Sequence, residues 1–244
     1  MKPPATTVVF DCETQDKICN MPGVDRNDQV AALEVSCLSY QILKSDEVVA
    51  SPERAAAEAD RADVFTLWRD EDELNEGPFE RMFQAFDDAE VIVSYNGCGF
   101  DHLLLWKYYA GNKLRYQQHM VKTHDVFARL RETTGFWYKL DHLLKENEVP
   151  TKTSNGLKAI EWWQEGERAL LQEYCEAVRP LPSRSPIKKK PERPWPRHAQ
   201  DVKCLAKLAA KPRLKLPRTD FVVPNQTFGA ASAIAAARAS ARLE

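Results

Sequence analysis

The pattern of apolar and polar positions predicts a sheet early in the chain and helices later. Short apolar runs rich in β-branched and aromatic residues predict buried strands at residues 6–10, 33–42, 63–68 and 91–95. Apolar residues recur at helical spacing in the segments 71–89, 102–109, 127–131, 140–146, 156–163 and 168–177. Strands first and helices later, around a mixed sheet, indicate an α+β or α/β arrangement.

Two segments do not fit this periodic pattern. Residues 45–63, SDEVVASPERAAAEADRAD, are acidic, rich in alanine and contain a proline, so we interpret them as an exposed excursion. The end of the chain, GAASAIAAARASARLE, has little to bury, and we expect residues 211–244 to form a partly disordered tail. The length of 244 residues suits one domain with such appendages.

Composition excludes several classes of protein. No uncharged run approaches the eighteen or so residues that a membrane span needs, and the N-terminus lacks the pattern of a secretory signal. The six cysteines are scattered, with no CxxC pair and no zinc-like spacing. We therefore expect an intracellular protein, cytoplasmic or nuclear, with reduced thiols and no membrane association.

The net charge of −2 hides an asymmetry. Residues from 178 onward carry 15 Lys and Arg against 4 Asp and Glu, whereas residues 1–177 carry 19 against 32. The acidic body and basic tail are either ordinary solvated surfaces or a device that holds a polyanion near a metal-binding body.

Three acidic residues lie at, or shortly after, the ends of predicted strands. Asp11 and Glu13 follow the first strand in FDCET, and residues two apart on an extended chain point to the same face. Two anions held that close repel each other, and a divalent cation relieves the repulsion. Asp101 follows the strand 91–95 in VIVSYNGCGFDHLLL, where it is either a first-turn helix acid or a third member of the site.

A further carboxylate emerges from an interrupted helix. EYCEA at 173–177 and QDVKCLAKL at 200–208 read as two halves of one amphipathic helix. Excision of residues 178–200 joins the halves, so that Tyr174 and Asp201 lie four apart on one helical face.

FDCET, YNGCGFD and the YC and DV of the split helix together resemble the three exonuclease motifs of the DEDD superfamily of 3′-5′ exonucleases, tyrosine subtype. The resemblance runs from about residue 6 to 210, and KLDHLLKEN is similar to the segment that precedes the final helix in these proteins. It implies an RNase H-like α/β domain over residues 1–210, with a mixed sheet flanked by helices. It also implies hydrolysis of single-stranded DNA or RNA from the 3′ end, with release of nucleoside monophosphates.

The resemblance further implies two Mg²⁺ or Mn²⁺ ions, roughly 3.5 to 4 Å apart, that clamp the attacking and leaving oxygens. Asp11 would bridge both ions. Glu13 and Asp201 would complete the site of the ion that bears the nucleophile, and Asp101 would hold the second ion through water.

The same resemblance assigns roles to three other side chains. Tyr174 would orient the attacking water, while Asn96 and Phe100 would contact the terminal nucleotide. The histidine subtype is the alternative, because His198 precedes Asp201. That subtype has a gap of five residues, whereas the gap here is three, so we favour Tyr174.

The segment 178–200 decides whether this site forms. It contains six prolines and seven Lys and Arg in 23 residues, and no helix passes through such a run. It is a loop that grips phosphates, a nuclear-import signal, or an unspliced intron translated in frame. If it displaces Asp201, the alternative function is a catalytically impaired nucleic-acid-binding or scaffold protein.

Overall fold

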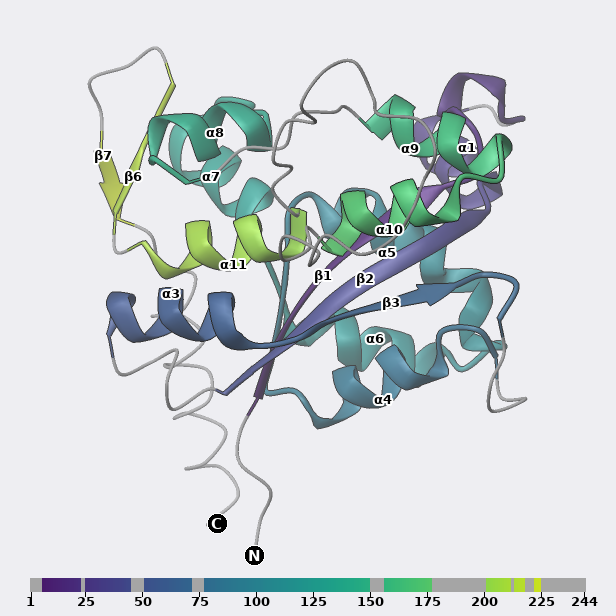
Figure 1. Ribbon diagram of the computed structural model, residues 1–244, viewed down its shortest axis with the longest axis horizontal. Helices are drawn as coiled ribbons and strands as arrows, with labels where there is room; N and C mark the ends of the chain where they lie inside the picture. Colours follow the sequence, from purple (N-terminus) through teal and green to yellow (C-terminus); the bar gives the residue numbers. More distant parts are fainter. Residues whose placement is uncertain are drawn as a thin grey trace, which may run out of the picture.

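The computed structural model describes residues 6–22, 25–44, 51–71, 77–149, 156–176, 201–211, 213–217 and 222–224. Five strands form one mixed sheet in the order β3-β2-β1-β4-β5 (Figure 1). Their bounds are β1 (Thr6–Thr14), β2 (Val35–Lys44), β3 (Val64–Trp68), β4 (Val91–Ser94) and β5 (Thr123–Asp125). The central strand β1 pairs antiparallel with β2 and parallel with β4, so the mixed sheet expected from the sequence is confirmed.

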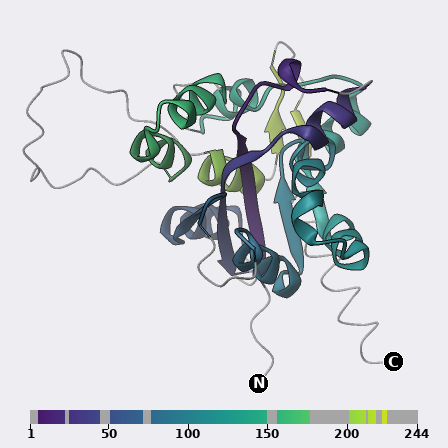
Figure 2. The same ribbon diagram turned by 90° about the vertical axis from the view of Figure 1, so that its right-hand side faces the viewer.

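Helices cover both faces of this sheet (Figure 2). Core residues on one face come from α3 (Pro52–Arg61), α7 (Val126–Thr134), α8 (Leu140–Glu146) and α11 (Asp201–Ala210). The opposite face packs against α1 (Arg26–Ala32), α4 (Glu80–Asp88), α5 (Asp101–Leu105), the 3-10 turn η3 (Trp106–Tyr109) and α6 (Lys113–Lys122), which contacts β4. Near β2 and β3 lie α9 (Gly156–Gln164) and α10 (Arg168–Glu176). Two more 3-10 turns are η1 (Ile18–Asn20) and η2 (Gly97–Gly99).

The strand β1 is longer than its apolar run indicated. It continues through FDCET, so Asp11 and Glu13 lie within the strand and not after it. Val8 and Phe10 pack into the core on one face, whereas Val9 packs into the core on the other. Since successive side chains alternate, Asp11 and Glu13 share the face of Val9, which α11 covers.

The prediction of an exposed excursion at residues 45–63 is wrong for its second half. Residues 52–61 form α3, whose Ala55 and Ala59 are fully buried against α11. The hydroxyl of Ser51 caps this helix by accepting from the N–H of Arg54 at 3.2 Å, and Pro52 occupies the first turn. Alanines four residues apart let two helices approach closely, so the alanine-rich composition marks a packing face.

The other periodic segments agree with the structure to within a few residues, although the helix expected at 71–89 begins only at Glu80. Part of the expected tail forms a hairpin of β6 (Arg213–Lys215) and β7 (Val222–Pro224). Asn147 holds this hairpin by accepting from the N–H of Lys215 and donating to its carbonyl, both at 2.9 Å. Residues 177–200 and 225–244 lie outside the described residues.

The six cysteines are free, and Cys12, Cys37, Cys175 and Cys204 are buried. In the part of the chain that the structure describes, we find no helix with the length and apolar character needed to cross a membrane.

Candidate functional site

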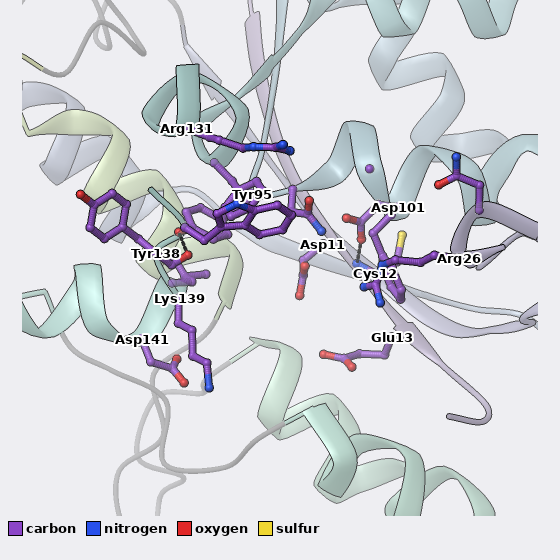
Figure 3. Close-up of a pocket in the computed structure, with 17 residues that line it drawn as sticks. Asp11, Cys12, Glu13, Arg26, Tyr95, Asp101, Arg131, Tyr138, Lys139 and Asp141 are labelled. Carbon is purple, nitrogen blue, oxygen red and sulfur yellow. Dashed lines mark hydrogen bonds between the residues drawn. The ribbon is translucent and has the colours of Figure 1, made fainter. Parts of the chain in front are cut away.

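A cleft of about 970 Å³ opens at the end of β1 and β4 (Figure 3). Its lining comes from β1, α1, the β4–α5 connection, the start of α5, α7, the α7–α8 connection and the start of α8. The lining residues are Asp11, Cys12, Glu13, Arg26, Asn27, Tyr95, Asn96, Gly99, Phe100, Asp101, Phe127, Arg131, Trp137, Tyr138, Lys139, Leu140 and Asp141. The structure thus brings five of the residues singled out from the sequence to one cleft, namely Asp11, Glu13, Asn96, Phe100 and Asp101.

Two carboxylates of the cleft come from β1. Asp11 is half-buried, and Glu13 is buried with 9% of its surface exposed. Their backbones pair with Ser39 and Cys37 of β2, which fixes the strand in position. Both side chains therefore project from a rigid central strand, the kind of element that holds a functional group in a defined place.

The third carboxylate, Asp101, belongs to the first turn of α5 and is only 4% exposed. Its Oδ1 accepts a hydrogen bond from the backbone N–H of Cys12 at 3.0 Å, which ties α5 to β1 across 89 residues (Figure 3). Burial, with a smaller contribution from the charge of Asp125, raises the pKa of Asp101 to about 7, although the Cys12 N–H opposes the shift. Asp101 is therefore a long-range bridge to β1, and the cap position of α5 belongs to Phe100.

The connection between β4 and α5 depends on Asp125, which the sequence analysis did not single out. Its carboxylate accepts from the N–H groups of Asn96 at 2.8 Å and Cys98 at 3.0 Å. It also caps α7 by accepting from Phe127 and Ala128. Asn96 adopts a left-handed conformation with φ of 64°, so Asp125 stabilises a strained turn that carries cleft residues.

Gly97 lets this turn pass close to β4. A Cβ atom at Gly97 would lie 2.4 Å from the hydroxyl of Ser94 and 2.5 Å from its Cβ. The only signal in the sequence for this architecture is the run of NG and GCG between a strand and a helix. The run THDVF, a short strand followed directly by an acid-capped helix, is the signal that points to Asp125.

Aromatic side chains, two cations and the acid Asp141 form the other wall of the cleft. Figure 3 shows Arg131, Tyr138 and Lys139 on one side and Cys12, Glu13 and Asp101 on the other. The hydroxyl of Tyr95 donates to the carbonyl of Tyr138 at 2.6 Å, which anchors the α7–α8 connection beside β4. These residues were missed from the sequence, where the run GFWYK between two helical patterns was the available signal.

Tyr174 is not among the residues that line the cleft. It is 3% exposed and packs in a hydrophobic cluster with Cys37, Trp68, Leu171 and Cys175, its ring 5.7 Å from that of Trp162. Asp201 is the first residue of α11, which contacts both α10 and β1, but its side chain is outside the described part of the structure. His198, the alternative to Tyr174, also lies outside the described residues.

The donor atoms of the cleft suit a hard divalent cation. Asp11, Glu13 and Asp101 offer carboxylate oxygens, the ligands that Mg²⁺ and Mn²⁺ favour in proteins. Among the side chains that the structure describes, no three His, Cys, Asp or Glu groups lie close enough to hold one ion together.

The model of the RNase_H superfamily matches residues 55–177, just over half of the chain. The matched segment includes Asp101 and Tyr174 but neither of the β1 carboxylates. No curated protein matches the sequence.

Several solved structures are similar. The family B DNA polymerase from the hyperthermophilic archaeon Pyrobaculum calidifontis has a TM-score of 0.44 at 21% identity, over 70% of this chain and 23% of that one. A product-bound exonuclease I has a TM-score of 0.38 at 13% identity, over 70% of this chain and 46% of that one. E. coli exonuclease I in complex with a 5cy-dT13 oligonucleotide has a TM-score of 0.36 at 15% identity, over 70% of this chain and 43% of that one. The chain spans less than half the length of these proteins.

Proposed function

Since this chain belongs to the RNase_H superfamily, we propose that it is a metal-dependent 3′-5′ exonuclease of single-stranded DNA or RNA. One observation carries the proposal. Carboxylates from the central strand, Asp11 and Glu13, and from the first turn of α5, Asp101, line one cleft. Its other wall holds aromatic side chains, the cations Arg131 and Lys139, and the acid Asp141. Carboxylates suit divalent ions and the opposite wall suits bases and phosphates, so the cleft fits a single-stranded polynucleotide.

The proposed metal ligands are the four carboxylates of Asp11, Glu13, Asp101 and Asp201. When bound, two Mg²⁺ or Mn²⁺ ions would polarise the scissile phosphate and lower the pKa of the attacking water. Asp11 would be a ligand of both ions, Glu13 and Asp201 would be ligands of one ion, and Asp101 would hold the other. The strand β1 orients the first two ligands, and the N–H of Cys12 orients Asp101.

The remaining proposed residues act on the substrate. Asn96 and Phe100, held by the turn that Asp125 stabilises, would contact the terminal nucleotide. Tyr174 would orient the attacking water. This role requires its hydroxyl to reach the cleft from the hydrophobic cluster in which the ring is packed. The proposed products are nucleoside monophosphates.

A catalytically impaired nucleic-acid-binding or scaffold protein is the second candidate. The packing of Tyr174 in a hydrophobic cluster favours it, because the residues that line the cleft do not include this proposed member of the site. The position of α11 favours the enzyme, because this helix begins at Asp201 and contacts α10 and β1. The helix that begins at Asp201 therefore lies beside the elements that carry Tyr174 and Asp11.

A polarity assay tests the proposal. Single-stranded oligonucleotides labelled at the 5′ or the 3′ end are incubated with the protein in Mg²⁺ or Mn²⁺. We expect the 5′ label to give a ladder and the 3′ label to appear at once as a mononucleotide. Asp11→Asn should abolish both signals, whereas Asp28→Asn, an exposed acid on α1, should change neither. Immediate release of a 5′-labelled mononucleotide would refute the assigned polarity.

A further inference from the structure

Two adjacent aromatic residues at the rim of the cleft are largely exposed. Phe136 is 66% and Trp137 is 69% exposed, and Trp137 lines the cleft. Large aromatic surfaces usually gain free energy from burial, so an exposed pair beside a polar cleft marks an interaction site.

Trp137 is exposed and yet held in place. The guanidinium of Arg131 lies 4.5 Å from the centre of its ring, within the range of a cation–π contact. The ring of Phe127 meets it edge-on, with centroids 5.2 Å apart and planes at 71°. Arg131 and Phe127 both belong to α7, so one rigid helix sets the orientation of the indole.

The turn that brings Trp137 back over α7 is itself fixed at both ends. Gly135 ends α7 with a φ of 77° and donates from its N–H to the carbonyl of Arg131 at 2.8 Å. On the far side, the bond from the hydroxyl of Tyr95 to the carbonyl of Tyr138 anchors the segment beside β4. The indole is therefore preorganised, and a ligand that stacks on it does not bear the full entropic cost of ordering it.

The charges around Trp137 indicate what would stack there. Arg131 contacts the indole directly, and Lys139 lies on the same wall of the cleft, where Asp141 is the one acidic side chain. A planar ring system that carries negative charge satisfies both features, and an unpaired nucleotide has this chemistry. The bases of a duplex are already stacked on one another, which favours a single strand.

We infer that Trp137 and Arg131 form a base-stacking platform that binds an unpaired nucleobase of a single-stranded nucleic acid beside the carboxylate cleft. The inference rests on the proposed function for the identity of the strand. It adds a binding residue that acts on the base, whereas the carboxylates act on the phosphate.

The test is the affinity for a fluorescein-labelled oligothymidylate, measured by fluorescence anisotropy without divalent metal, so that the strand stays intact. Trp137→Ala should raise the dissociation constant about 5- to 150-fold, the range expected for loss of one stacked base. Trp137→Phe should keep most of the affinity because a smaller ring still stacks. Trp106→Ala is the matched control, since Trp106 is also partly exposed but packs on Tyr116.

An oligonucleotide with abasic sites separates stacking from a structural role of the indole. Wild type and Trp137→Ala should bind the abasic strand with the same affinity, and both should unfold at the same temperature. An equal loss of affinity on the abasic and the thymidine strands would overturn the inference. Failure of the wild-type chain to bind any single strand would overturn it too.

The outcomes for the platform and for the nuclease are distinct. If the strand is bound through Trp137 but never degraded, the platform stands and the exonuclease proposal fails. If the strand is degraded and Trp137→Ala changes neither the dissociation constant nor KM, the exonuclease stands and the platform fails.

Discussion

Replacement of Asp125 by alanine should destabilise this protein well beyond the loss of an ordinary helix cap. Asp125 is 5% exposed and accepts four backbone hydrogen bonds. Two of the donors are in the first turn of α7, and the other two, Asn96 and Cys98, belong to the turn between β4 and α5. The side chain thus links two elements that both line the cleft.

The bonds of Asp125 give the expected magnitude. Loss of an N-cap costs about 1 kcal/mol. A hydrogen bond to a charged acceptor contributes about 1.5 kcal/mol at the low end of its range, so the bonds to Asn96 and Cys98 add about 3 kcal/mol. We take the low end because Asp125 repels the nearby Asp101, and its removal relieves that repulsion. Asp125→Ala should therefore lower the free energy of unfolding by about 4 kcal/mol.

Urea denaturation at pH 7, followed by tryptophan fluorescence, measures this difference. The matched control is Asp25→Ala, because Asp25 caps α1 by accepting from Asn27 and Asp28 but is exposed. Its loss should cost about 1 kcal/mol. Asp125→Asn should fall between the two, since it keeps one acceptor oxygen. If Asp125→Ala costs no more than Asp25→Ala, the carboxylate does not stabilise the turn and the reasoning is refuted.

Three further outcomes follow from the structure. Gly97→Ala should lower the free energy of unfolding by about 1–3 kcal/mol, because its new methyl group clashes with Ser94. Gly135→Ala should cost less, because its methyl group meets no atom within 4 Å and only the positive φ is strained. Thermal unfolding compares the two variants, and the reverse order of stability would contradict the packing argument. Burial lowers the pKa of His124 to about 4, so the stability that its neutral form contributes is complete above pH 6.5 and is lost as pH falls from 6.5 to 4, by about 3 kcal/mol in all. His124→Gln should flatten the dependence of the free energy of unfolding on pH between 4 and 6.5, measured by urea denaturation. An unchanged dependence would show that His124 is not its source. Tyr174→Phe should reduce the rate of nuclease turnover at least about tenfold without a change in melting temperature, while equal turnover would restrict Tyr174 to packing.

The apolar runs predicted β1 to β4, which the helices on either side of the sheet bury, and hydrophobic periodicity predicted most later helices, because each buries one face. It failed at α3, where composition pointed to a loop although Ala55 and Ala59 repeat at the helical interval of four. Alanine contributes little to a hydrophobic pattern, and its importance here comes from the close approach of α11. The hairpin of β6 and β7 was missed because its strands have only three residues each.

The candidate site, like the fold, could be predicted from the sequence only in part. The sequence predicts that Asp11 and Glu13 share a face, because strand geometry is local. It does not reveal that Asp125 supports a turn 27 to 29 residues away, since that contact exists only once β4 and β5 are paired. The exposure of Trp137 likewise depends on the left-handed turn at Gly135, and the position of Tyr174 depends on how α10 packs on β2 and β3.

The most direct test of the account is degradation of 5′-labelled single-stranded DNA and RNA in Mg²⁺ or Mn²⁺ by three proteins. These are the full chain, its Asp11→Asn variant and a variant that lacks residues 178–200. The account predicts a metal-dependent ladder from the full chain and none from Asp11→Asn. A ladder from the deletion variant alone would mean that the inserted segment disables an exonuclease site. No degradation by either the full chain or the deletion variant would contradict the assignment of this cleft as a nuclease site.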